Sequence, residues 1–431
     1  MHEAFLYFLW QFQYFTKIAL TTTDGESLQV LHPGFRNTNA GPDFTNARLL
    51  INDVEWVGTV EMHQRTSDWL AHQHQHDRAY DNVILHVVWQ DDRRTTGRRV
   101  DRANGTLLPT LALCALTDAA LLDRYGALTE SPDIIPCAGQ FREVAPLRIT
   151  SMLDKAMLQR LERKAQGVQQ VVEQTGGDWE ETAYRLLAMN MGFKINTEPM
   201  QQLSRAVPLK AILKHRNALL QVEAMLFGTA GLLPTDEPDE YITAIGREYR
   251  FLASKYALAE KEIAPHVWKW GRLRPANFPT LRLAQLARLL THHASLFSLF
   301  VGTNDVDLLL KSFQIQPSAY WQTHYRFGKA AEKTTATLGQ NSASILIINT
   351  VVPLLAAYAH HRGQPAYLDR AIYLLEQLPP EKNRLIEGWD TLGLGIQTAF
   401  DSQAAIELYN EFCSVKKCLS CQIGASLLKQ K

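Results

Sequence analysis

Residues 41–89 read GPDFTNARLLINDVEWVGTVEMHQRTSDWLAHQHQHDRAYDNVILHVVW. Within this stretch two apolar runs, Phe44–Ile51 and Val54–His63, flank the turn signal Asn52-Asp53, a pattern that predicts two paired strands of a hairpin. Asp43 opens the first run and Glu61 lies near the end of the second. Because paired strands bring such positions to one edge, we expect both carboxylates at the same end of the sheet.

These two carboxylates predict a metal site. Oxygen ligands suit hard divalent cations, so Asp43 and Glu61 are candidate ligands for Mg²⁺ or Mn²⁺. A metal held in this way can activate a water molecule and offset the negative charge of a phosphodiester. The pair therefore points to metal-dependent hydrolysis.

A histidine-rich segment follows the second acid. It predicts a helix capped by Ser67 or Asp68, and side chains four residues apart share one face of a helix. The residues on that face are Asp68, His72, His76 and Tyr80. On such a helix His74 points away, whereas His72 and His76 lie one turn apart and could share a zinc ion. A zinc-dependent hydrolase is therefore an alternative, although the Glu of the metalloprotease signature H-E-x-x-H is absent.

The order of the expected elements is helix, strand, strand, strand, helix, strand. With its acids, this order resembles the PD-(D/E)XK phosphodiesterase superfamily over roughly residues 1 to 115. Pro42-Asp43 matches the first motif of that superfamily, Glu61-Met62-His63 matches the second with His where Lys is usual, and His76 to Tyr80 resembles the Q-x-x-x-Y helix.

The resemblance implies a restriction-endonuclease-like fold and a Mg²⁺- or Mn²⁺-dependent nuclease. Asp43 and Glu61 would bind the metal, and His63 would position water in place of the lysine. His76 and Tyr80 would contact phosphate or orient the acids. The missing lysine leaves a second alternative open, a catalytically inactive scaffold of the same fold that binds nucleic acid or a protein partner.

A second resemblance extends over almost the whole chain. Six strings are similar to those of an uncharacterised bacterial family, domain-of-unknown-function family 2851. They are GPDF-x-N-A, G-x-V-E-x-H, S-D-W, H-x-x-D-x-A-Y, R-L-R-P-x-N-F-P and C-L-S-C-x-I-G. The name of that family implies no biochemistry.

The length of the chain predicts two or three domains. The chain has 431 residues and balanced charge, with 44 basic and 44 acidic residues, so any site for DNA or RNA must be a local patch. Residues 1–145 show the strand patterns of an α+β or α/β domain, whereas residues 146–431 show helical periodicity, which predicts an all-α domain. We expect no signal peptide and no membrane span. An odd number of cysteines, five, is typical of the reducing cytoplasm.

Three of these cysteines lie close together in sequence, spaced C-x4-C-x2-C: Cys413, Cys418 and Cys421. Such spacing is typical of soft-metal ligation, and Cys137 could supply a fourth thiolate. The candidate cofactors are zinc and an iron–sulfur cluster, because some PD-(D/E)XK nucleases join the chain ends around such a cluster. Ordinary burial of the cysteines as small apolar residues is the alternative.

Arginines mark two candidate phosphate-binding segments, because the guanidinium group presents a planar fork to oxyanions. One segment follows Trp89 and contains Arg93, Arg94, Arg98 and Arg99. The other contains Arg272 and Arg274 beside tryptophans, and could stack bases or simply connect two helices.

Overall fold

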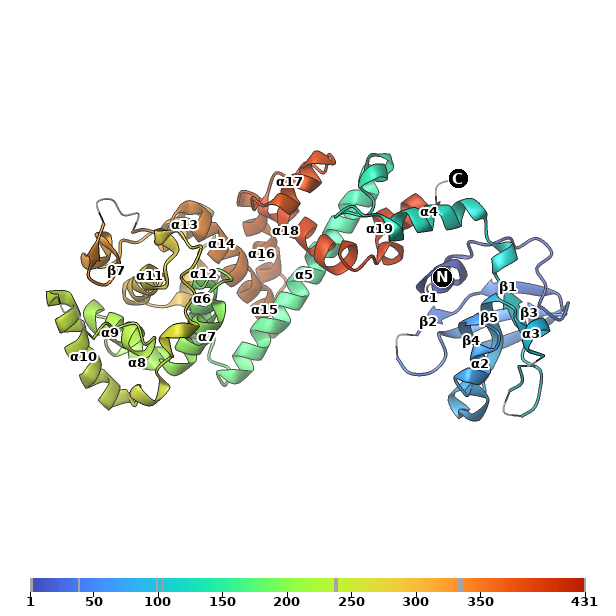
Figure 1. Cartoon of the computed structure of the whole chain (residues 1–431), viewed down its shortest axis with the longest axis horizontal. Helices are drawn as coiled ribbons and strands as arrows, with labels where there is room; N and C mark the ends of the chain where they lie inside the picture. Colours follow the sequence, from blue (N-terminus) through green and yellow to red (C-terminus); the bar gives the residue numbers. More distant parts are fainter. Residues whose placement is uncertain are drawn as a thin grey trace. The chain divides into compact units, whose positions relative to one another are not determined.

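The computed structural model describes residues 3–37, 39–97, 100–102, 104–235, 239–331 and 336–429 (Figure 1). The chain divides into two compact units. The first contains residues 1–152 and 409–431, and the second contains residues 153–408. The sequence had assigned residues 409–431 to the helical domain, whereas their contacts place them in the N-terminal unit.

A mixed sheet forms the centre of the first unit. Its strands, as far as the chain is described, are β1 (Leu28–His32), β2 (Phe35–Arg36), β3 (Phe44–Ile51), β4 (Val54–Arg65), β5 (Val83–Gln90) and β6 (Thr110–Ala112). They lie in the order β1-β3-β4-β5-β6, with β2 paired to the start of β3. The first three strands of this order are antiparallel, and β5 and β6 then continue in parallel to β4.

The hairpin predicted at Asn52-Asp53 joins β3 and β4. Both turn residues have positive φ, 48° and 64°, as a two-residue type I′ turn requires. β4 is exposed along its first four residues and buried at its centre, where it lies between β3 and β5. Gly58 is needed there, because a Cβ at this position would lie 2.5 Å from Ile84 Cγ2 and 2.6 Å from the carbonyl of Asn82.

The described part of the first unit also contains helices. They are α1 (Glu3–Phe12), α2 (Asp68–Ala71), α3 (Arg93–Thr96), α4 (Ala119–Glu130) and α19 (Gln422–Lys429). α1 contacts β4 and buries one apolar face, including Phe5, Leu6 and Leu9. α1 ends at Phe12, and the next residue, Gln13, adopts a φ of 57°.

Helices dominate the second unit, as the sequence predicted. Their bounds are α5 (Pro146–Gln174), α6 (Trp179–Met191), α7 (Thr197–Ala206), α8 (Leu209–Leu213), α9 (Leu219–Thr229), α10 (Glu240–Tyr256), α11 (Pro279–His292), α12 (Leu296–Gly302), α13 (Val306–Phe313), α14 (Gln340–Leu346), α15 (Val352–Arg362), α16 (Ala366–Gln377), α17 (Arg384–Thr391) and α18 (Ala399–Leu408). A small hairpin, β7 (His324–Arg326) and β8 (Lys329–Ala330), interrupts them. The predicted order of an α+β domain followed by a larger helical domain is therefore confirmed.

One helical run in the described residues is long and apolar enough to cross a membrane. It extends from Gln340 to Arg362, with a mean hydropathy of 1.8, and 78% of its most apolar window is buried within the protein. No such run was expected from the sequence. The core helix of a soluble protein meets the same criterion, and the burial of this run fits that description.

Candidate metal centre

The two predicted acids lie together at one edge of the sheet. In the antiparallel ladder Phe44 pairs with Val60, which places Asp43 opposite Glu61. The backbone N–H of Asp43 donates to Glu61 Oε2 at 3.1 Å, and the backbone N–H of Met62 donates to Asp43 Oδ2 at 3.0 Å. Each carboxylate thus accepts a hydrogen bond from the strand that carries the other acid.

Burial makes this pair electrostatically costly. Glu61 is only 6% exposed, and burial together with the charge of Asp43 raises its pKa to about 8. Burial also raises the pKa of Asp43, although a hydrogen bond from Tyr7 of α1 opposes that change. Glu3 of α1 adds a further negative charge near both acids. A cation would offset this accumulation of negative charge.

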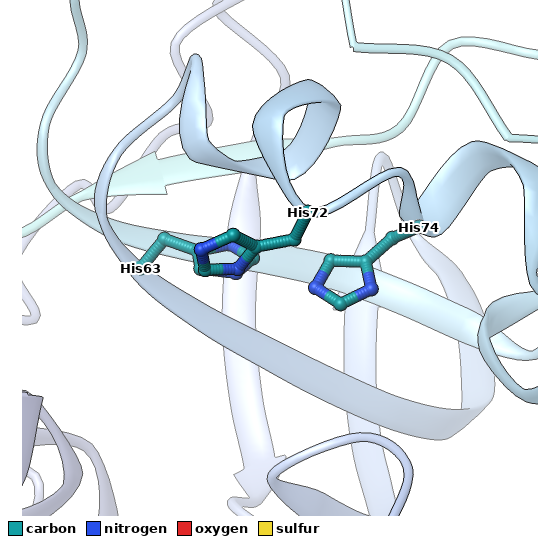
Figure 2. Close-up of side chains that lie close together, drawn as sticks. All are labelled: His63, His72 and His74. Carbon is teal, nitrogen blue, oxygen red and sulfur yellow. The ribbon is translucent and has the colours of Figure 1, made fainter.

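Three histidines lie close to one another, and two of them lie near the carboxylate of Glu61. His63, His72 and His74 each bring one ring nitrogen within 4.8 Å of the others (Figure 2). His63 Nε2 lies 3.0 Å from His72 Nδ1. Glu61 Oε1 lies 3.6 Å from His63 Nε2 and 3.5 Å from His74 Nε2. We call these three residues the histidine trio, the one group of this spacing among the described His, Cys, Asp and Glu side chains.

The histidine trio depends on a break in the helix that the sequence predicted. α2 ends at Ala71, and Gln73 then adopts a left-handed conformation with φ 61°. This reversal returns His74 towards His63, where Tyr80 stacks on the His74 ring at 3.9 Å between centroids. His76 is exposed in the following 3-10 turn, His74–His76. The continuous helix predicted to carry Asp68, His72, His76 and Tyr80 on one face is therefore wrong. The His72–His76 zinc pair assumed that helix and stays a prediction.

Burial keeps the central imidazoles of this site neutral. It lowers the pKa of His63 to about 3, and it also lowers the pKa of His74 and of His86 on β5. His63 Nδ1 lies 2.8 Å from His86 Nε2, so both ring nitrogens of His63 have histidine partners. A buried neutral ring of this kind cannot supply the positive charge of the lysine that the resemblance led us to expect.

The donor set suits a transition metal better than Mg²⁺. Neutral imidazole nitrogens and a carboxylate are ordinary ligands of Zn²⁺, Fe²⁺ and Mn²⁺. His74 Nε2 is buried and has no hydrogen-bond partner, as expected of a nitrogen whose lone pair is reserved for a metal. Ligation through His63 Nε2 requires its proton on Nδ1, where His86 Nε2 would accept it. The residues present therefore fit a divalent metal.

The predicted phosphate-binding arginines differ in their availability. Arg93 pairs with Asp91 and Asp24, each at 3.0 Å, so its guanidinium group is already engaged. Arg94 is exposed on α3. Arg98 and Arg99 lie outside the described residues. Arg272 and Arg274 are exposed in the second unit.

The predicted cysteines form a separate group in the first unit. Cys137, Cys413, Cys418 and Cys421 are all buried there, although Cys137 is far from the other three in sequence.

Two histidines of the acid and histidine site, His74 and His86, were not singled out by sequence periodicity. The H-x-H-x-H string at His72 contained His74, but a regular helix would have turned it away.

Comparison with known proteins leaves the biochemistry of this site open. No curated protein and no solved structure matches the chain. One family does match, and its description is protein of unknown function (DUF2851). Since that match extends over residues 3–384, most of the sequence, the chain belongs to the DUF2851 family.

Proposed function

We propose that this protein is a metal-dependent hydrolase whose substrate is a phosphodiester of nucleic acid. One observation carries the proposal. The buried carboxylate of Glu61 accepts a hydrogen bond from the backbone N–H of a second acid, Asp43, and lies 3.6 Å and 3.5 Å from the Nε2 atoms of His63 and His74. Burial of this kind is unfavourable without a cation, and buried charges in proteins are usually paired or bound to metals.

Each residue has a role that follows from its position. His63, His72 and His74 would hold the metal through neutral ring nitrogens, with Glu61 beside them. A divalent metal bound there supplies a Lewis acid that lowers the pKa of a water molecule and offsets the charge on a phosphodiester. Asp43, next to the ligands but not one of the histidine trio, would orient that water or accept its proton.

The choice of substrate rests on the sheet and on the sequence motifs. Asp43 immediately precedes β3 and Glu61-Met62-His63 lies in the buried half of β4, which supports the resemblance to PD-(D/E)XK nucleases. The antiparallel strands followed by parallel ones are compatible with that fold. Exposed arginines such as Arg94, Arg272 and Arg274 are candidates to contact the phosphates of DNA or RNA. We propose the reducing cytoplasm as the location.

A specific observation favours a second candidate function, a catalytically inactive scaffold. His63 occupies the position of the expected lysine, is 2% exposed, and has both ring nitrogens engaged by His86 and His72. Such a residue can hold a metal but cannot approach a substrate as a mobile cation. The scaffold would bind nucleic acid or a protein partner without cleaving it.

Metal binding and cleavage, measured on the same protein, test both proposals. The variant that we suggest is Asp43→Asn with Glu61→Gln, because the new amide oxygens can still accept the backbone N–H groups of Met62 and Asp43. The matched control is Glu55→Gln, an exposed residue of β4 that pairs with Arg48 at 2.6 Å. Chelated protein would be titrated with Mn²⁺, Zn²⁺ and Mg²⁺ by calorimetry and assayed on single- and double-stranded DNA and RNA.

We expect wild type and Glu55→Gln to bind Mn²⁺ or Zn²⁺ and to cleave at least one substrate. The double variant should lose cleavage by a factor of about 100 or more, the loss typical of removing a catalytic charge or general base. Equal cleavage by the double variant and wild type would exclude Asp43 and Glu61 from the reaction. Metal binding without cleavage of any substrate would favour the scaffold.

A further inference from the structure

A positively charged residue that no sequence motif indicated, Arg36, lies at the sheet edge that carries Asp43. Arg36 is the second residue of β2, and it pairs with Phe44, the first residue of β3. Phe44 directly follows Asp43, and the backbone N–H of Asn37, next to Arg36, donates to the carbonyl of Asp43 at 2.7 Å. The strand pairing therefore places Arg36 beside one acid of the hydrolytic site.

Hydrogen bonds and close packing hold β2 in this position. Gly34 precedes the strand with φ 89°, and a Cβ there would lie 2.7 Å from a carbonyl oxygen of β3, so the two chains pass close together. The carbonyl of Pro33 accepts a hydrogen bond from Trp10 Nε1 of α1 at 2.9 Å. After the strand, the side-chain amide of Asn37 donates to the carbonyl of Pro42 at 3.0 Å. The backbone that carries the arginine is thus fixed on both sides.

The guanidinium group of Arg36 lies over the ring of Tyr7 in α1. Its Cζ is 4.4 Å from the ring centroid, within the range of a cation–π contact. The phenol of Tyr7 donates a hydrogen bond to the carboxylate of Asp43, and its ring lies 6.2 Å from that of Phe44. Arg36 and Asp43 therefore have Tyr7 as a common neighbour.

The charge of Arg36 acts on the carboxylate of Asp43. Burial raises the pKa of Asp43, and hydrogen bonds from Tyr7 and from the Met62 backbone oppose that rise. The nearby Glu3 also raises this pKa, whereas the positive charge of Arg36 lowers it. This electrostatic effect agrees with the strand pairing and with the contact on Tyr7.

Arg36 is available to bind an anion from solution. Its side chain is exposed, and no described carboxylate forms an ion pair with it. Two other arginines of the first unit are already engaged, since Arg48 pairs with Glu55 at 2.6 Å and Arg93 pairs with two aspartates. A guanidinium group presents five N–H donors in a planar fork that matches the oxygens of a phosphate.

We propose that Arg36 binds the phosphate of the substrate beside Asp43. The inference rests on the hydrolase proposed above and adds a residue that contacts its substrate. Two buried acids repel a phosphodiester, and burial lowers the pKa of His63 and His74, so these neutral rings do not offset the repulsion. Arg36 would hold a phosphate oxygen by charge-assisted hydrogen bonds and position the phosphorus next to the water that Asp43 orients.

Two substitutions of Arg36 test this role. Arg36→Gln removes the charge, and Arg36→Lys keeps the charge but loses the fork. The matched control is Arg48→Gln, which changes an exposed arginine of the neighbouring strand β3. For each protein kcat and KM are measured on single- and double-stranded DNA and RNA oligonucleotides. Oligonucleotide binding is measured at several salt concentrations with and without Mn²⁺, and calorimetry gives the affinity for Mn²⁺.

We expect Arg36→Gln to lower kcat/KM by about 10- to 100-fold, the range for losing one hydrogen bond to a charged group. Its binding of oligonucleotides should weaken, and the slope of log affinity against log salt concentration should fall by about 1. Arg36→Lys should recover part of both losses. Arg48→Gln should match wild type, and Mn²⁺ affinity should change by less than about 2-fold in every variant.

Failure of this inference is distinguishable from failure of the hydrolase. If wild type cleaves an oligonucleotide and Arg36→Gln cleaves it equally well, the role of Arg36 is overturned and the hydrolase stands. A loss of Mn²⁺ affinity as large as the loss of cleavage would also overturn it, because Arg36 would then act through the metal site.

If wild type cleaves no oligonucleotide, the hydrolase fails and the binding measurements decide the role of Arg36. Weaker binding and a smaller salt slope in Arg36→Gln than in Arg48→Gln would uphold the phosphate contact. Equal binding by these two variants, or no binding by wild type, would overturn it.

Discussion

Two buried glutamates, one in each unit, differ in the charges of the side chains around them. Glu407 of the second unit is 0% exposed and accepts hydrogen bonds from Arg163 at 2.6 Å and Arg160 at 3.4 Å. Glu61 of the first unit is 6% exposed, but its neighbours are another acid and two imidazoles that burial keeps neutral. The fold itself neutralises Glu407. The described side chains beside Glu61 supply no such charge, and burial together with Asp43 raises its pKa to about 8, which favours the protonated form.

The largest effect that we predict is the loss of folding stability when Glu407 is replaced. Glu407→Ala leaves two arginines beside an empty buried site, and breaking a buried ion pair in this way costs about 3–5 kcal/mol. Denaturant unfolding, followed by circular dichroism, measures the change. The control is Glu162→Ala, an α5 residue whose side chain is 52% exposed, which should cost less than about 0.5 kcal/mol. A loss below about 1 kcal/mol for Glu407→Ala would contradict the role of Glu407 as a neutralised structural group.

A third buried glutamate, Glu223, makes the stability of the protein depend on pH. Glu223 of α9 is 1% exposed, accepts a hydrogen bond from Tyr241 at 3.0 Å, and burial raises its pKa from 4.5 to about 7. The folded state thus binds a proton more tightly than the unfolded state. Its contribution to stability is complete below pH 4.5 and declines by roughly 3 kcal/mol as pH rises towards 7.

Unfolding free energies measured across this pH window, for wild type and Glu223→Gln, check the prediction. The variant should show a smaller decline, because an amide does not titrate. Identical pH profiles for the two proteins would show that Glu223 keeps an ordinary pKa despite its burial.

The histidine trio predicts different results for two neighbouring histidines. His74→Ala should weaken Mn²⁺ or Zn²⁺ binding by about 100-fold, since it removes a ligand of the proposed metal, and even outer partners of ligands contribute 10- to 100-fold. His76→Ala should change affinity by less than about 2-fold, because His76 is exposed and outside the histidine trio. Calorimetry on chelated protein measures both. Equal losses of metal affinity in the two variants would contradict a specific role for His74 in metal binding.

The smallest effect has the opposite sign to that at Glu407. In metal-free protein Glu61→Gln should leave stability unchanged or raise it by up to about 1 kcal/mol, since it removes repulsion between two acids and keeps an acceptor for the Asp43 N–H. Denaturant unfolding in excess chelator is the measurement. A loss of 3 kcal/mol or more would make Glu61 a structural residue like Glu407.

Local patterns predicted part of this site, and longer-range geometry decided the rest. The convergence of Asp43 and Glu61 followed from strand alternation and a two-residue turn, which are local. His74 was lost because four-residue periodicity assumes an unbroken helix, and the left-handed Gln73 is a non-glycine residue that gives no composition signal. His86 contacts His63 only through the parallel pairing of β4 and β5, which sequence spacing does not specify.

The cysteines differ from the histidines in this respect. Their spacing indicates a shared site with Cys137 as a candidate member, but no local pattern predicts that residues 409–431 return to the first unit. The helical periodicity of this segment resembles that of the second unit. Membership of a unit is decided by burial against distant residues, as in the packing of α19 on α4.

The return of residues 409–431 makes the helical unit an insertion within the first one. During synthesis the chain emerges from its N-terminal end, so every residue of the helical unit is available before the last part of the first unit. The first unit therefore stays incomplete, without α19, while more than half of the protein is synthesised. The helical second unit can therefore fold before the first unit is complete.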